Sequence, residues 1–167
     1  MIEVVSIDTP SLGDRSYLAT DGEVAVVIDP QRDLDRVIRI VEQRQLRLTH
    51  VLETHVHNDY VTGGFALAQH TGATYVLNAD DEVAFDHQGV TDGDELRTGD
   101  LVLRVVHTPG HTPTHLSYAL HDASGKAIGV FTGGSMLFGS IGRTDLVDMA
   151  MTETLSRSQY RSVRSLE

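Results

Sequence analysis

Two apolar segments of this sequence each run directly into a histidine-rich segment. Residues 48–53 precede Thr-His-Val-His-Asn-Asp at 54–59, and residues 101–107 precede Thr-Pro-Gly-His-Thr at 108–112. Short apolar runs of this kind are typical of buried β-strands. Functional side chains are often placed on the loops that follow such strands. If the two sets of histidines act together, the chain must fold so that these two strand ends meet.

The remaining pattern predicts an α/β fold. Residues 33–45 repeat apolar side chains at the i, i+3, i+4, i+7 spacing of an amphipathic helix, and Asp21-Gly22 is a hairpin signal. We expect two more helices, at 64–70 and at 152–166, with Thr152 as N-cap of the last. β-Branched and apolar runs predict further strands at 1–8, 16–20, 23–29, 73–77, 116–120 and 127–132. We expect an acidic surface excursion with a short strand at 80–99, and a glycine-rich loop at 133–145.

Size and charge limit the function classes. With 167 residues the chain can form one domain with a hydrophobic core, which we assign to residues 1–167. The formal net charge of −11 argues against nucleic acid and anionic membranes as partners. No apolar run approaches the roughly 20 residues of a transmembrane helix. The N-terminus lacks the basic residues of a signal peptide, so we expect a cytoplasmic location.

His55 and His57 are the strongest candidates for metal ligands. Residues two apart in an extended segment point to the same side, so both imidazoles can converge on one ion. Asp59 continues this parity and can supply a carboxylate, as a ligand or as a hydrogen-bond partner of a ligand. His111 follows a Pro-Gly turn that would present it at a fixed angle. Because the chain has no cysteine, these residues favour one Fe²⁺ or Zn²⁺ ion held by nitrogen and oxygen.

Other polar residues near these segments allow more than one interpretation. His107 and His115 fit three roles: metal ligand, hydrogen-bond partner of a ligand, or ordinary surface residue. The glycines at 133, 134 and 142 are first explained as turns. Arg143 lies between a glycine and a threonine, where a guanidinium can also bind a substrate carboxylate.

Taken in order, four motifs resemble the metallo-β-lactamase superfamily: THVHND, HTPGHT, FTGG and GRTDL. Within it they are similar to the branch of persulfide dioxygenases and hydroxyacylglutathione hydrolases (glyoxalase II). GRTDL in particular is similar to persulfide dioxygenases and their rhodanese-fused bacterial relatives. The resemblance implies a metallo-β-lactamase-type αββα sandwich of two mixed sheets, with the metal site at one edge of both.

The sequence departs from the family pattern at three places. The family's HxHxDH ends in Tyr60 here, and Gly134 stands where the family's TGD has its aspartate. Family members also continue beyond the point where this sequence stops at Glu167. We therefore expect the last C-terminal elements, with a late histidine of a second metal site, to be lacking. A sheet without those elements keeps an unpaired edge, from which we expect a homodimer.

The resemblance implies first a mononuclear non-haem-iron persulfide dioxygenase, with a functional link to a rhodanese. Its substrate would be glutathione persulfide or a similar low-molecular-weight thiol derivative. His55 and His111 would bind iron, with His57 or Asp59 completing the site. Tyr60 would hydrogen bond to the substrate. The substrate-binding residues would be Arg143, on the thiol's carboxylate, and His115.

Two other functions stay open at this point. The first is a zinc-dependent thioester hydrolase of the glyoxalase II type, with Asp59 as the general base. The second is a non-catalytic or incomplete family member with a binding role. Tyr60, Gly134 and the end of the sequence at Glu167 motivate this last hypothesis.

Overall fold

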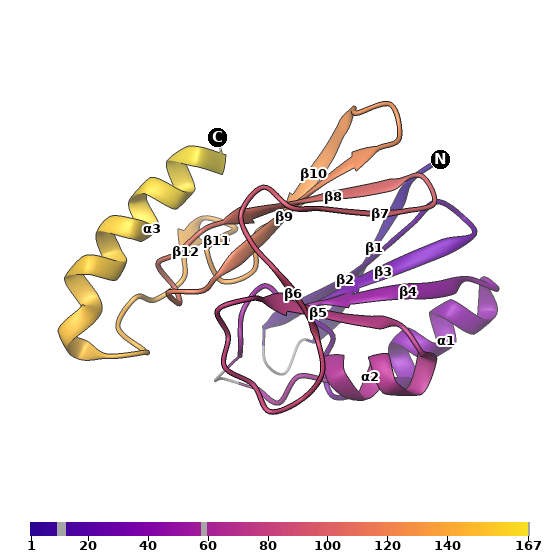
Figure 1. Cartoon of the computed structure of the whole chain (residues 1–167), viewed down its shortest axis with the longest axis horizontal. Coiled ribbons are helices and arrows are strands. Elements are labelled where there is room, and N and C mark those ends of the chain that lie inside the picture. Colours follow the sequence, from indigo (N-terminus) through magenta and orange to yellow (C-terminus); the bar gives the residue numbers. More distant parts are fainter. Residues whose placement is uncertain (10–12, 58–59, 167) are drawn as a thin grey trace.

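The computed structural model describes residues 1–9, 13–57 and 60–166 of the chain. Figure 1 shows the elements in chain order. They are β1 (Glu3–Thr9), β2 (Asp14–Thr20), β3 (Val24–Ile28), α1 (Asp35–Gln43), β4 (Arg47–Leu52), α2 (Gly64–Thr71), β5 (Thr74–Asn78), β6 (Gln88–Val90), β7 (Glu95–Thr98), β8 (Leu101–His107), β9 (Leu116–Asp122), β10 (Ala127–Phe131), β11 (Met136–Leu137), β12 (Ser140–Ile141), the 3-10 turn η1 (Met149–Met151) and α3 (Thr152–Leu166).

The strands form two main sheets and one small hairpin. The first sheet has the order β1-β2-β3-β4-β5-β6; it is antiparallel from β1 to β3 and parallel from β3 to β6. The second sheet, β10-β9-β8-β7, is antiparallel throughout. β11 and β12 pair only with each other among the described strands. In Figure 1, α1 and α2 lie on the side of the first sheet that faces away from the second sheet.

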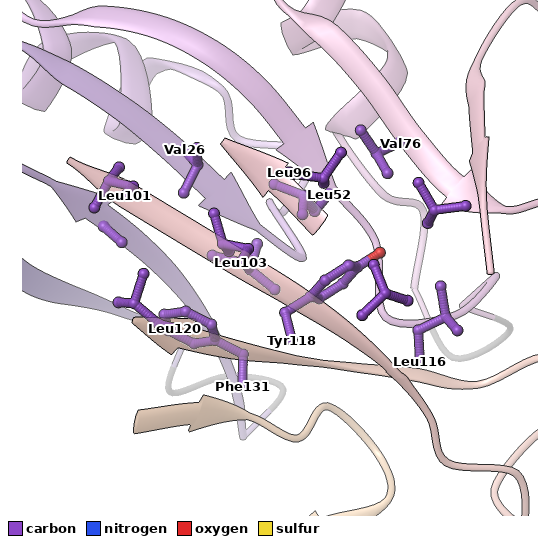
Figure 2. Close-up of a cluster of buried hydrophobic side chains, with 14 of the residues drawn as sticks. Val26, Leu52, Val76, Leu96, Leu101, Leu103, Leu116, Tyr118, Leu120 and Phe131 are labelled. Atoms are coloured by element: carbon purple, nitrogen blue, oxygen red, sulfur yellow. The ribbon is translucent and has the colours of Figure 1, made fainter. Parts of the chain in front are cut away.

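Strand β3 shows why the first sheet lies in the middle of the molecule. All of its residues are buried, so neither face of the strand meets water. Val24, Val26 and Ile28 pack in the cluster between the two sheets, whereas Ala25 and Val27 pack toward α1 and α2. Side chains alternate between the faces of a strand, so one apolar run serves two cores. Figure 2 shows the cluster between the sheets, in which Tyr118 lies among aliphatic side chains.

The expected α/β sandwich is confirmed, and three details differ from the sequence expectations. The acidic stretch 80–99 holds two strands, because β6 completes the first sheet and β7 opens the second. The expected loop 133–145 contains the hairpin β11–β12. Thr152 does not cap the last helix: Asp148 caps the preceding turn η1, where its extended backbone lets its side chain accept a hydrogen bond from the amide of Ala150.

The segment after β4 joins the two sheets. The amide of Leu116, at the start of β9, donates to the carbonyl of Thr54 at 2.7 Å. The hydroxyl of Tyr118 donates to the carbonyl of Glu53 at 2.8 Å. The end of β4 is therefore held against β9, close to the loop that follows β8.

Helix α3 supports the loops on the other side of this junction. The side-chain amide of Gln159 donates to the hydroxyl of Ser135 at 3.0 Å, and the hydroxyl of Ser162 donates to the carbonyl of Pro109 at 2.7 Å. Both loops that α3 contacts belong to the histidine and glycine motifs. None of the helices among the described residues is long and apolar enough to cross a membrane.

The packing of the core between the sheets makes a stability prediction. Leu103 in β8 is 0% exposed, whereas Leu146 is 41% exposed. We expect Leu103→Ala to lower the free energy of unfolding by about 2–5 kcal/mol, because it leaves a cavity between two packed sheets. The control Leu146→Ala should change it by about 0.5 kcal/mol or less. Urea unfolding of both variants checks this, and equal losses would contradict the described core.

Candidate metal centre

A cavity of about 1150 Å³ opens where the two sheets meet, and three of the candidate histidines line it. His55 and His57 reach it from the segment after β4, and His111 from the loop after β8. Residues of the β1–β2 hairpin and residues between 130 and 143 also line the cavity. The strand ends that the sequence predicted to meet do meet.

The imidazole rings of these histidines are close neighbours. The ring centroids of His55 and His57 are 4.0 Å apart, and those of His55 and His111 are 4.8 Å apart at an angle of 84°. Two imidazoles bound to one ion through bonds of about 2.0–2.1 Å have ring centroids roughly 5 Å apart in tetrahedral geometry. The spacing of His55 and His111 therefore fits a shared metal ion.

Hydrogen bonds orient His55 for metal binding. The hydroxyl of Thr54 donates to Asp29 Oδ2 at 2.8 Å, so its oxygen must accept from His55 Nδ1, 2.9 Å away. This contact places the proton of the neutral imidazole on Nδ1 and leaves the lone pair on Nε2. Burial, together with the neighbouring His57 and His115, lowers the pKa of His55 to about 2, which keeps the ring neutral.

His111 is oriented in the same way. Its Nδ1 lies 2.9 Å from the backbone carbonyl of Arg143, which can only accept a hydrogen bond. The Nδ1 proton is therefore committed, and Nε2 carries the lone pair that a metal requires. The two rings line one cavity, and their centroids are 4.8 Å apart. With an unprotonated Nε2 on each ring, the pair fits a divalent metal ion.

His57 makes a different set of contacts. Its Nε2 lies 3.3 Å from Asp29 Oδ1, 3.3 Å from Glu53 Oε2 and 3.0 Å from the hydroxyl of Tyr60. Burial alone would lower the pKa of His57, but hydrogen bonds and the charges of Asp29 and Glu53 outweigh it and raise the pKa to about 10. These contacts hold the His57 ring beside His55 and favour its protonated form.

The two carboxylates that contact His57, those of Asp29 and Glu53, differ in their surroundings. Asp29 accepts from the amide of Thr54 at 2.7 Å, and contact with His57 lowers its pKa against the opposing effect of burial. Burial raises the pKa of Glu53, whose Oε1 accepts hydrogen bonds from Thr62 and Tyr75. Among the described residues, Asp29, Glu53 and His57 form the group of possible ligands whose ligand atoms all lie within 4.8 Å of one another. His55, His57 and His111 do not form such a group there, so all three can hold one ion only if their rings rotate.

The other predicted site residues fall into different positions. Tyr60 and Arg143 line the cavity, and both hydrogen bonds found for the Arg143 guanidinium go to Asp145, at 2.9 and 2.6 Å. His115 is fully buried, stacks on His55 with ring centroids 5.1 Å apart, and is not among the residues that line the cavity. It is therefore placed to support His55 rather than to touch a ligand. Asp59 lies outside the described residues.

Gly134 lies directly against a candidate ligand. A Cβ atom added there would come within 2.3 Å of His111 Cδ2. The position at which the family pattern has an aspartate is thus adjacent to His111. A side chain there would require the His111 ring to move.

Sequence reasoning missed the residues that hold the histidines. Asp29 was interpreted only as the end of a strand, and Glu53 as the last residue of another. Asp29 is marked in the structure rather than in the sequence: its backbone adopts φ of 50°, which is uncommon for a residue other than glycine and often marks a functional site.

Comparison with known proteins decides the family. The sequence signature of the metallo-beta-lactamase superfamily matches residues 15–166. This chain belongs to the metallo-beta-lactamase superfamily.

Within this superfamily, the chain is similar to two groups of named enzymes. It is 32% identical to the mitochondrial persulfide dioxygenase ETHE1 of Homo sapiens, over 99% of this chain and 62% of that protein. It is 29% identical to hydroxyacylglutathione hydrolase GloC of Haemophilus influenzae, over 86% of this chain and 76% of that protein. The chain spans 58% and 62% of the first two persulfide dioxygenases that it matches.

Solved structures agree with this placement. A metallo-beta-lactamase from Staphylococcus aureus superposes with a TM-score of 0.89 at 30% identity, covering 98% of this chain and 52% of that one. ETHE1 from Myxococcus xanthus superposes with a TM-score of 0.76 at 38% identity, covering 86% of this chain and 62% of that one. The branch inferred from the motifs is confirmed.

The buried histidines of this superfamily member predict a pH dependence of stability. Burial lowers the pKa of His115 to about 3, below the value of about 6.5 expected in the unfolded chain. Between these two pH values the unfolded chain binds a proton at His115 that the folded chain does not bind. The stability of the metal-free protein therefore falls as the pH drops below about 6.5. His115 contributes up to about 1.4 kcal/mol per pH unit to the slope of the unfolding free energy against pH. His115→Gln should flatten the curve of unfolding free energy against pH from 7 to 5; curves parallel to wild type would contradict a neutral buried His115.

Proposed function

We propose that this chain is a mononuclear, non-haem-iron dioxygenase that acts on a low-molecular-weight persulfide. The observation that carries the proposal is the pair of Nε2 atoms that His55 and His111 present to one cavity. Similarity to persulfide dioxygenases from two organisms supports the reaction type. Ferrous iron suits a site of imidazoles and a carboxylate, and when bound it would supply the activation of dioxygen.

A two-metal mechanism is less consistent with the residues of this chain. In the family pattern a histidine at position 60 binds the second metal, and the aspartate at position 134 bridges two metals or ligates a single iron. Tyr60 and Gly134 stand at these positions here, so the mononuclear site lacks one family ligand and the two-metal site lacks two. A phenol and a hydrogen atom do not replace an imidazole and a carboxylate as ligands. One ion at His55 and His111 therefore accounts better for the side chains present.

Each residue around the site has a role in this proposal. Asp29 and Glu53 hold His57 through Nε2, and His57 would complete the site after its ring loses a proton and rotates toward the ion. Asp59 is the alternative third ligand in the proposal. Tyr60, whose hydroxyl lies 3.0 Å from His57 Nε2 on the cavity wall, is placed to hydrogen bond to the substrate. Arg143 lies on the same cavity and would anchor the carboxylate of the thiol.

A zinc-dependent thioester hydrolase is the second candidate. Its support is the similarity to hydroxyacylglutathione hydrolases, one of which is matched over 76% of its length. Zinc at the same histidines would polarise a water molecule, and Asp59 would act as general base. Release of thiol from S-lactoylglutathione by the zinc-loaded protein, without oxygen uptake by the iron-loaded protein, would favour this function.

The cellular context remains part of the proposal. We propose a cytoplasmic protein that acts on a small thiol derivative, without nucleic acid or membrane partners, in functional association with a rhodanese. The homodimer and the single domain over residues 1–167 also stay predictions.

Oxygen uptake by iron-loaded protein tests the proposed function. With glutathione persulfide or N-acetylcysteamine persulfide as substrate, we expect dioxygen consumption that His55→Ala and His111→Ala each reduce by about 100-fold or more, because a ligand is lost. Tyr60→Phe keeps the ring and should reduce the rate by about tenfold. His121→Ala, on β9 and outside the cavity, serves as control. No oxygen uptake from verified iron-bound protein with either persulfide would overturn the proposal.

A further inference from the structure

Helix α3 docks on the rest of the molecule through a face that is mostly polar. Its buried residues are Leu155, Gln159 and Ser162, and Gln159 is 0% exposed. Helices usually dock through an apolar stripe, and burying an amide is costly unless it is hydrogen bonded. The contacts of Gln159 must therefore explain why an amide is buried at this position.

Three polar side chains of α3 follow one another at three-residue spacing, so they lie on one face of the helix. Each of them hydrogen bonds to a different loop beside the candidate metal centre. The three bonds join Ser156 to Thr144 at 2.7 Å, Gln159 to Ser135 at 3.0 Å, and Ser162 to the carbonyl of Pro109 at 2.7 Å. Helix α3 thus connects the GRTDL segment, the residue after FTGG and the HTPGHT segment.

Gln159 also contacts the residue that precedes His111. A Cβ atom added at Gly110 would lie 2.4 Å from Gln159 Oε1 and 2.5 Å from Gln159 Cα, so the backbone of Gly110 lies directly against this glutamine. Gln159 Oε1 is buried and accepts no hydrogen bond from the described residues. The amide is held by its nitrogen, which donates to the hydroxyl and to the carbonyl of Ser135.

The loops that α3 holds are the loops that contact the His111 ring. Gly134, directly before Ser135, lies against the ring, since a Cβ atom added there would come within 2.3 Å of His111 Cδ2. The carbonyl of Arg143, directly before Thr144, lies 2.9 Å from His111 Nδ1. Helix α3 therefore bonds to the neighbour of each backbone group that orients this imidazole.

We infer that Gln159 is a positioning residue for His111. It holds the residue before His111 and the residue after Gly134, so the ring and the backbone against which it packs keep one arrangement. The inference rests on the metal ion of the proposed function and does not depend on the reaction. Helix docking and metal binding are then linked: the docked helix favours the ion, and the bound ion stabilises the docked helix.

The orientation of His55 should not depend on Gln159. The ring of His55 is oriented through Thr54 and Asp29, which follow β4 and β3 of the first sheet. Loss of the Gln159 amide should therefore disturb one imidazole ligand and leave the other in place. A general loss of stability would affect both ligands.

Binding of Co²⁺ to the full chain tests the inference without turnover. Gln159→Met keeps the length of the side chain and removes its amide. We expect the dissociation constant for Co²⁺, measured by titration of the d–d absorption, to rise about tenfold or more, because a group that orients a metal ligand is lost. Tyr160→Met places the same residue at the adjacent, 69% exposed position of α3, and it should change this constant by less than about twofold.

A second control separates positioning from lost stability. Val37 is 2% exposed and packs under α1, on the face of the first sheet that is turned away from the second sheet. Val37→Ala should lower the unfolding free energy of the metal-free protein. It should change the dissociation constant for Co²⁺ by less than about twofold, because the site is distant and shares no partners with it.

The Co²⁺-loaded protein gives a further readout that a merely structural role would not move. The Nδ1 protons of imidazoles bound through Nε2 give paramagnetically shifted NMR signals. We expect Gln159→Met to speed the exchange with water of the His111 signal and to leave the His55 signal unchanged. Val37→Ala should change neither signal.

A milder variant keeps the test open if Gln159→Met does not fold. Ser162→Ala removes one hydroxyl and its bond to the carbonyl of Pro109. We expect the same selective effect on the His111 signal. The dissociation constant for Co²⁺ should rise about two- to tenfold, as loss of one hydrogen bond implies.

Three results would overturn the inference. Gln159→Met and Ser162→Ala could bind Co²⁺ as tightly as wild type, the His55 and His111 signals could change together, or wild type could bind no Co²⁺. The expected Co²⁺ results without oxygen uptake by the iron-loaded wild type would instead sink the proposed reaction and leave the role of Gln159 standing.

Discussion

The buried carboxylate of Asp29 connects the fold of this chain to its candidate metal centre. It lies at the end of β3 and accepts hydrogen bonds from both the amide and the hydroxyl of Thr54, at 2.7 and 2.8 Å. Through that hydroxyl it fixes the proton of His55 on Nδ1, and through a 3.3 Å contact it holds His57. A buried charge is costly unless it is well paired. Asp29 is stable only where these partners converge, so one side chain orients two imidazoles.

This dependence explains why the site lies where it does. β3 and β4 are parallel neighbours in the first sheet, so their carboxyl ends lie side by side and bring Asp29 next to Thr54. The hydrogen bond from the amide of Leu116 to the carbonyl of Thr54 brings the second sheet to the same place. Helix α3 is hydrogen bonded to the loop that carries His111. The histidine motifs are short, but the whole arrangement of sheets is needed to bring them to one cavity.

The sequence predicted the elements whose signals are local. Apolar runs gave β8 and β9 nearly to the residue, and the HxH spacing together with the Pro-Gly turn identified His55 and His111. Asp29 and Glu53 were missed because their roles depend on partners across sheets, such as Thr54 at 25 positions from Asp29. The hairpin β11–β12 was missed because two-residue strands have no detectable period.

If His55 and His111 hold one metal ion, the metal content of the protein must depend on both side chains. Untagged protein, purified without chelators and reconstituted with Fe²⁺ or Zn²⁺, would be measured by mass spectrometry beside His55→Ala, His111→Ala and the control His121→Ala. We expect about one ion per chain in wild type and control, and less than about 0.1 in the two ligand variants. Absence of bound metal in wild type, or equal metal content in all four proteins, would contradict it.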